Sequence, residues 1–183
     1  MKSVNLTAIA LAALLSAAAL PALAQVMVGG APMYSNKDIV DNAVNSKDHT
    51  TLVAAVQAAG LVPTLKGTGP FTVFAPTNAA FAALPAGTVD TLLKPENKPA
   101  LTKVLTYHVV AGKFDSAALI KAVDAGGGKA TLTEVSGGTL TVTKSGTMIM
   151  LSDESGGMAH VTIPDVVQSN GVIHVVDKVL LPK

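Results

Sequence analysis

The sequence predicts an α+β domain, in which helices and antiparallel strands occupy different parts of the chain. Two observations support this class. Up to about residue 123 the chain is rich in alanine, and its apolar residues recur at helical spacing. Beyond that point glycines and β-branched residues replace the pattern, as expected for strands joined by short turns. No repeat of fixed period divides the chain, so we expect a single unit.

The N-terminus has the features of a cleavable export signal. Lys2 precedes an uncharged stretch from residue 4 to residue 20, and Ala22-Leu23-Ala24 has the small-x-small pattern that signal peptidase reads. The alternative is a transmembrane anchor. An anchor needs roughly 20 strongly apolar residues, whereas alanine dominates here and Pro21 breaks the run. We therefore expect residues 1–24 to be a signal peptide that is removed.

The Sec route and a bacterial source are the simplest interpretation of this segment. It has neither a twin arginine nor a cysteine that could be lipidated. We expect a secreted or periplasmic protein that begins at Gln25 and has no stable membrane insertion after signal cleavage. Residues 25–35 contain two glycines and a proline and are predicted to form a flexible lead-in. Residues 36–183 then fit one compact domain.

Helices are predicted where apolar residues lie three and four positions apart. Asp48 or Thr50 is the expected N-cap of the second helix, and Gly60 is its expected end. A short helical turn or an extended link follows at 61–66. The helical segments, in order, are 36–44, 48–60, 77–84, 89–93, 101–105 and 116–123.

One strand is predicted among the helices, and five follow them. Phe71 to Phe74 is β-rich and alternates, Pro76 ends it, and Thr77 caps the next helix. Asn170-Gly171 is the sharpest turn signal in the chain, because both residues tolerate positive φ and a two-residue type I′ turn needs it twice. The later strands are 130–135, 140–144, 148–152, 159–163 and 172–176.

Composition excludes several classes of function. All 13 basic residues are lysine, and loss of Lys2 with the signal would leave 12 lysines against 12 acidic residues. Arginine supplies the planar fork that grips phosphates and base edges, and net positive charge supplies long-range attraction. The chain has neither, so nucleic acid is not an expected partner. The absence of cysteine excludes disulfides, thiolate metal sites and cysteine nucleophiles.

Two motifs that could hold a cofactor or a metal fail on spacing. Gly126 to Lys129 looks like a phosphate loop, but Val123 stands where the first glycine is required, and no serine or threonine follows the lysine. His108, His160 and His174 are all predicted in strands. None has a second ligand at the spacing of a histidine metal site. We therefore expect no metal and no cofactor.

A set of serine, histidine and acid is the most serious enzymatic interpretation. The second half of the chain holds all three residue types, but no serine lies in Gly-x-Ser-x-Gly. Ser136, Ser145 and Ser155 fall in predicted turns, where tightening the turn is a sufficient role. We expect no enzyme activity, with an unrecognised hydrolase as an alternative.

Three segments are more informative together than separately. Residues 71–81 join strand, proline, cap and helix; 105–110 join a helix end to a strand; 170–177 form a turn with its outgoing strand. In this order they resemble the first box, the Tyr-His motif and the second box of the fasciclin domain family, over about residues 35–183. The chain looks most like single-domain secreted bacterial members. The motif residues are Thr77, Asn78, Phe81, Tyr107, His108, Asn170, Gly171, His174 and Asp177.

The resemblance implies a wedge-shaped β-sandwich with the helices of the N-terminal half grouped on one side. It also implies a role in adhesion and no cofactor. In animal members the Tyr-His motif and an Asp-Ile pair before the second box are linked to receptor binding. Here Tyr107 and His108 match the motif, Asp165 matches the acid, and Val166 replaces the isoleucine. These four are the candidate binding residues, and a purely structural role for Tyr107 and His108 is the alternative.

We predict a binding module that adheres to a cell-surface or matrix protein or polysaccharide. A carrier of a small apolar ligand is one alternative, and it requires a closed apolar cavity of several hundred Å³. A hydrolase requires serine and histidine within hydrogen-bond reach. If His108 and His174 serve the fold, each is expected to be buried and hydrogen-bonded.

Overall fold

The computed structural model describes residues 25–183, so the predicted signal peptide lies outside the described residues. The described chain begins with a two-stranded hairpin of β1 (Val26–Val28) and β2 (Ala31–Met33). The flexible lead-in predicted for residues 25–35 therefore contains two paired strands. The hairpin forms because Val28, Ala31 and Met33 are buried against the domain, a tertiary contact that a pattern rich in glycine does not reveal.

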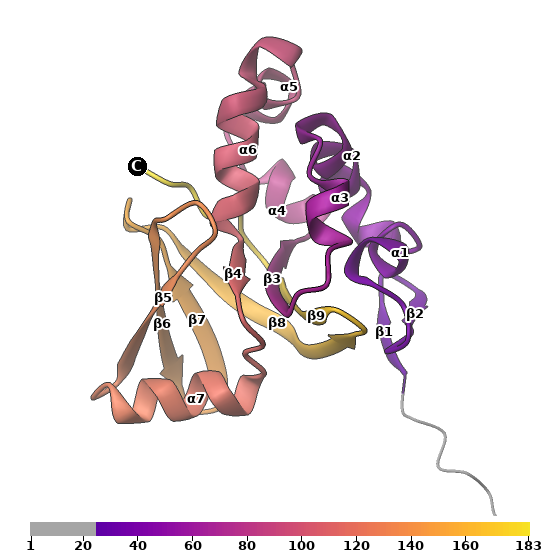
Figure 1. Ribbon diagram of the computed structural model, residues 1–183. Helices are drawn as coiled ribbons and strands as arrows, with labels where there is room; N and C mark the ends of the chain where they lie inside the picture. Colours follow the sequence, from indigo (N-terminus) through magenta and orange to yellow (C-terminus); the bar gives the residue numbers. More distant parts are fainter. Residues whose placement is uncertain (1–24) are drawn as a thin grey trace, which may run out of the picture.

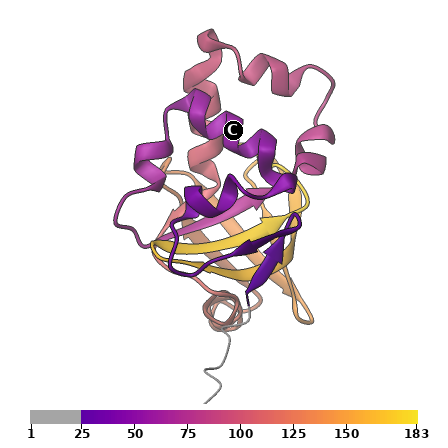
Figure 2. The same ribbon diagram turned by 90° about the vertical axis from the view of Figure 1, so that its right-hand side faces the viewer.

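The helices form one group above the sheet, as Figures 1 and 2 show. Seven α-helices and two short 3₁₀ segments occur in residues 25–183, and only α7 lies apart, at the lower end of the strands (Figure 1). They are α1 (Ile39–Ala43), η1 (Lys47–His49), α2 (Thr50–Ala59), α3 (Val62–Leu65), α4 (Asn78–Ala82), α5 (Thr88–Leu92), η2 (Pro95–Asn97), α6 (Lys98–Tyr107) and α7 (Ser116–Ala125).

A seven-stranded sheet has the order β4-β3-β9-β8-β7-β6-β5. Only β3 and β9 are parallel neighbours within it. The two edges approach each other, because Val110 of β4 bridges to Glu134 just after β5. The strands are β3 (Phe71–Pro76), β4 (Val109–Ala111), β5 (Lys129–Thr133), β6 (Thr139–Ser145), β7 (Met148–Ser152), β8 (Met158–Gln168) and β9 (Gly171–Val176). The predicted α+β class is confirmed.

Strands β3 and β9 are buried on both faces and separate two cores. Val73 and Val175 face the first core, under the helices. Phe74 and Val176 face the second core, which fills the space between β3–β9 and the curled β5–β8. α7 covers the end of this second core, where Leu119 has no exposed surface. Each face of the two central strands therefore needs apolar residues, which explains their near-continuous hydrophobic runs.

The predicted type I′ turn at Asn170-Gly171 is wrong. The turn residues are Ser169 and Asn170, and Gly171 is the first residue of β9. In residues 25–183 only Asp165 has positive φ among non-glycine residues, and Gly171 is not among the glycines that do. Glycine is needed at 171 for another reason: a Cβ there would collide with the carbonyl group of Phe71 in β3.

Three local predictions also need correction. His49, not Asp48 or Thr50, is the N-cap of α2, because η1 runs directly into that helix. The predicted end of α2 at Gly60 is confirmed, and Gly60 has a φ of 73°. His108 was predicted in a strand but is the C-cap of α6, one residue before β4. β8 continues past its predicted end to Gln168, through two register shifts against β9.

Candidate functional site

Tyr107 ends α6 and has no exposed surface. Its hydroxyl donates a hydrogen bond to the Thr139 carbonyl at 2.9 Å and accepts one from the Glu154 backbone N–H at 3.1 Å. Burial raises the pKa of the Tyr107 phenol to about 12, with the nearby acidic groups adding to the shift. The ring therefore ties α6 to β6 and to the turn between β7 and β8.

His108 is buried with 2% exposure and uses both ring nitrogens. Nδ1 lies 2.8 Å from the Val104 carbonyl, to which it donates, and Nε2 accepts a hydrogen bond from the Leu180 backbone N–H at 3.0 Å. Burial lowers the pKa of His108 to about 4. The neutral ring links α6 to the C-terminal segment. The expectation of a buried, hydrogen-bonded histidine is confirmed here.

His174 in β9 has the same character. It has no exposed surface, and its ring stacks on Phe74 with centroids 5.6 Å apart. Nε2 donates to the Phe114 carbonyl at 2.7 Å, and Nδ1 accepts from the Asp165 backbone N–H at 3.3 Å. Burial lowers the pKa of His174 as well. The same expectation is confirmed for this residue.

Asp165 lies in a bulge of β8. Ile163 pairs with Val175 and Val166 with Ile173, so two residues of β8 stand opposite His174 alone. Asp165 adopts φ of 58° there. Its carboxylate accepts hydrogen bonds from the Ser116 backbone N–H at 2.6 Å and from the Ser116 hydroxyl, at the start of α7.

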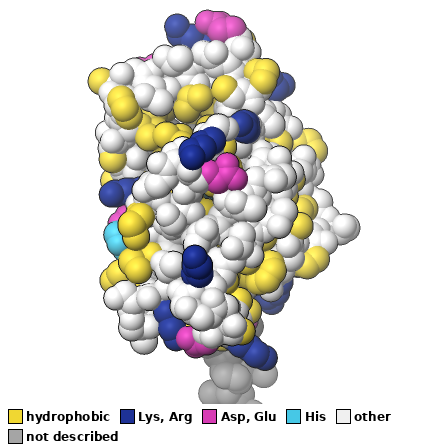
Figure 3. Space-filling view, turned by 90° about the vertical axis from the view of Figure 1, so that its left-hand side faces the viewer, with side chains coloured by type: hydrophobic (Ala, Val, Ile, Leu, Met, Phe, Trp, Pro, Cys, Tyr) yellow, Lys and Arg dark blue, Asp and Glu magenta, His cyan; other side chains and the backbone are white. Residues whose placement is uncertain are grey.

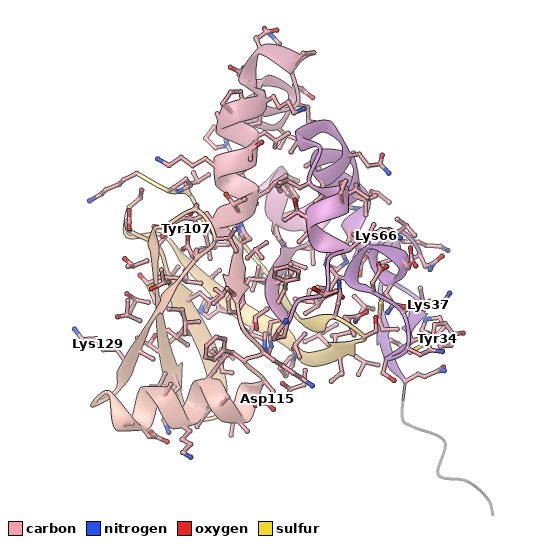
Figure 4. All side chains as sticks on the ribbon, in the orientation of Figure 1. Tyr34, Lys37, Lys66, Tyr107, Asp115 and Lys129 are labelled. Atoms are coloured by element: carbon pink, nitrogen blue, oxygen red, sulfur yellow. The ribbon has the colours of Figure 1, made fainter. Side chains whose placement is uncertain are left out.

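The structure divides the four candidate binding residues between two places. Tyr107 lies at the upper end of the strands, whereas Asp115, the residue before Ser116, lies at the lower end (Figure 4). Val166 is 1% exposed and Asp165 is half-buried. Tyr107 and His108 therefore do not form one surface with the Asp165-Val166 pair.

Asp165 and Val166 border an open groove of about 630 Å³ between the β1–β2 hairpin and the β8 bulge. The groove also has Tyr34 in its wall, and the Lys37 ammonium lies 5.1 Å from the centre of that ring (Figure 4). Val167, beside it, is 39% exposed. No sequence pattern indicates this groove, because one of its walls is the unpredicted β1–β2 hairpin. The groove lining is Gln25, Val26, Met33, Tyr34, Ser35, Asn36, Asp165, Val166 and Val167.

The first-box residues connect the start of α4 to α2. The Thr77 hydroxyl caps α4 by accepting from the Ala80 N–H at 3.2 Å. The Asn78 side chain accepts from the Thr51 N–H at 3.0 Å and donates to the Lys47 carbonyl at 2.8 Å. Phe81 is buried in the core under the helices.

The second box performs a similar task at both ends of β9, with Asn170 just before the strand and Asp177 just after it. The Asn170 amide donates to the Leu65 carbonyl at 2.7 Å, and its oxygen accepts from the Ile39 N–H at 3.1 Å. Asp177 accepts from the His160 backbone N–H at 2.7 Å and contacts His160 Nδ1 at 2.9 Å. Both side chains thus join distant segments through backbone groups.

One serine–histidine contact was missed in the sequence. Ser46 Oγ lies 2.9 Å from His49 Nδ1, and both residues are at most 3% exposed. Burial lowers the pKa of His49, and the nearby Ala75 carbonyl partly offsets this shift. Within residues 25–183, Nε2 of His49 has no hydrogen-bond partner. The pair borders an apolar cavity of about 50 Å³. Such a cavity is too small for a substrate or a carried ligand of ordinary size.

Neither a metal cluster nor a membrane span stands out in the described part of the chain. Within residues 25–183, no three His, Asp or Glu side chains are grouped as metal ligands. No helix in that range is both long and apolar enough to cross a bilayer.

Comparisons with other proteins agree with this architecture. The family model described as Fasciclin domain matches residues 47–182. Protein sll1483 of Synechocystis is 48% identical over 157 residues, which cover 85% of this chain and 79% of that protein. Immunogenic protein MPB70 of Mycobacterium bovis is 39% identical over 145 residues, covering 76% of this chain and 66% of that protein.

A solved structure shares the fold. The FAS1 domain pair of the insect cell adhesion molecule Fasciclin I superposes with a TM-score of 0.69 at 18% identity. The match covers 79% of this chain and 51% of that one, so this chain spans about half of the solved pair. The chain belongs to the fasciclin domain family, and the resemblance noted in the sequence is confirmed.

Proposed function

We propose that this chain is an exported binding module that adheres, through its outer surface, to a cell-surface or matrix protein or polysaccharide. One observation carries the proposal: the polar groups of the family motifs are used inside the fold. Tyr107, His108 and His174 have at most 2% exposure, and their hydrogen bonds end on backbone groups of the same chain. A partner therefore meets other residues.

The groove beside β8 is the binding surface that we favour. It combines an aromatic ring at Tyr34, exposed apolar surface at Val167 and a carboxylate at Asp165. A concave surface with an aromatic residue and a few polar groups suits a polymer chain or a loop of a protein. Asp165, which is half-buried, thus keeps a place in the proposal. Val166 is 1% exposed and, like Tyr107 and His108, supports the fold from within.

We infer export of the protein from its N-terminal sequence. Residues 1–24 have the pattern of a Sec signal, and we place the mature N-terminus at Gln25. The insect relative is a cell adhesion molecule, which accords with action outside the cytoplasm.

Substitution in the groove tests the proposal. Val167→Asp puts a charge on the exposed apolar part of the groove and is expected to weaken co-sedimentation with the cell-envelope and polysaccharide fractions of the producing cells at least tenfold. Val135→Asp is the matched control, since Val135 is 45% exposed and lies outside the groove. Equal binding by both variants at unchanged melting temperature would remove the groove from the proposal.

A further inference from the structure

The outer face of β7 carries two methionines. Ile149 and Leu151 are buried, so the pleat turns Met148 and Met150 outward. Met148 is 51% exposed. Across the strand pair, β6 places Thr143 opposite Met150. Two thioether sulfurs therefore stand on a face whose neighbouring side chains are small and uncharged.

β8 adds a third methionine and a histidine to this face. Buried Ala159 separates Met158 and His160, which both point outward. His160 pairs directly with Met150 across the strands. Directly opposed side chains have Cβ atoms about 5 Å apart, and diagonal neighbours lie about 7–8 Å apart. Met158 lies diagonally from Met150 and two residues before His160 on the same strand, roughly 7 Å away. The long side chains of Met150 and Met158 can therefore reach the imidazole of His160.

Asp177 orients this imidazole. Its carboxylate contacts His160 Nδ1 at 2.9 Å and also accepts from the His160 backbone N–H. When the ring donates from Nδ1 to this carboxylate, Nε2 carries the lone pair, and it has no hydrogen-bond partner within residues 25–183. A carboxylate on one ring nitrogen and a metal on the other is the usual environment of a metal-binding histidine.

His160 also differs from the other histidines in exposure. Its side chain is 38% exposed, whereas His49, His108 and His174 are at most 3% exposed. Figure 3 shows the face that lies on the left in Figure 1. A histidine side chain (cyan) is visible at the edge of this face, next to hydrophobic and acidic side chains. The site is open to an ion from solution.

We propose that Met150, Met158 and His160 bind Cu(I), with Asp177 as the residue that positions the imidazole. Thioether sulfur is a soft ligand that selects Cu(I), and imidazole nitrogen also suits copper. Hard cations such as Ca²⁺ need several oxygen ligands, which this face lacks. Met148 stands two positions before Met150 and offers a further sulfur. The site has no signal in the spacing of histidines along the chain, because its methionine and histidine ligands come together only across paired strands.

Anaerobic titration with Cu(I) in competition with bicinchoninate tests the site on the purified exported protein. We expect one Cu(I) per chain, with NMR shifts at the methyl groups of Met150 and Met158 and at the His160 ring. Met150→Leu and Met158→Leu should each lower the Cu(I) affinity about tenfold or more at unchanged melting temperature. Met27→Leu is the control, because Met27 is 56% exposed on β1 and lies on another element.

Three results would overturn the proposal. The first is that the protein does not take Cu(I) from bicinchoninate. The second is that the Met150→Leu, Met158→Leu double variant binds Cu(I) as tightly as the original chain. Finally, binding of Cu(II) or Zn(II) that needs His160 but neither methionine would define a different site.

Discussion

At His108 and His174 both ring nitrogens are committed to backbone groups, and both rings are neutral near pH 7. Burial is the cause, since it lowers the pKa of each ring. A general base needs access to solvent or substrate, which neither ring has. These residues hold together segments far apart in the sequence, such as β9 with the loop before α7.

His174→Ala is expected to destabilise the domain by about 1–3 kcal/mol, because the Phe114 carbonyl loses its donor and the Asp165 N–H loses its acceptor. The free energy of unfolding in urea measures this loss. His174→Gln, which keeps hydrogen-bonding capacity, should recover part of it. An unchanged unfolding midpoint in the alanine variant would contradict the structural role.

Glu134 gives the stability of the protein a dependence on pH. It is 4% exposed, its Oε1 has no partner in residues 25–183, and Ser136 donates to Oε2. Burial raises its pKa from 4.5 to about 7. The protonated form is therefore favoured by folding, and its contribution is complete below about pH 4.5 and is lost as the pH rises through 7.

Glu134→Gln mimics the protonated side chain at every pH. We expect the variant to be more stable than the original chain at pH 8, by about 2–3 kcal/mol at most, with the difference vanishing near pH 4.5. The three buried histidines act in the opposite direction, so the variant should lose stability more steeply on acidification. Parallel stability curves of the two proteins between pH 4.5 and 8 would contradict this assignment.

At the scale of elements, most helices and strands could be predicted because their apolar periodicity also satisfies the tertiary fold. Gly60 and Thr77 end and begin helices as local rules require. Local rules failed at Asn170 because its side chain bonds Ile39 and Leu65, from other parts of the chain. The β1–β2 hairpin and the groove beside it could not be predicted for the same reason, because contacts with residues far along the chain create them.

Gly171 packs tightly against the backbone of Phe71 in β3. Gly171→Ala should destabilise the domain by more than Gly137→Ala, because the added Cβ at 171 would meet the Phe71 carbonyl, whereas the one at 137 meets only open space. The control still carries the cost of positive φ, about 1 kcal/mol or more, since Gly137 has φ of 88°. Equal melting temperatures for the two variants would show that β3 can move aside without cost.

At the scale of the whole molecule, the two cores explain why the motif residues stabilise the fold and why we place binding on the outer surface. The family motifs lie where helices, central strands and curled strands meet, and they use their polar groups there. The groove beside the β1–β2 hairpin is the part of the outer surface that we propose for adhesion.

The central claim is that the motif residues serve the fold and that binding takes place elsewhere on the surface. Adhesion of the His108→Ala variant to the envelope fraction, measured per folded molecule over a temperature series, tests it most directly. We predict that the variant melts at a lower temperature and that its binding falls only in step with unfolding. The reason is that the His108 ring bonds to the backbone groups of Val104 and Leu180 and is only 2% exposed to solvent. A His108→Ala protein that stays fully folded but no longer binds would contradict the claim.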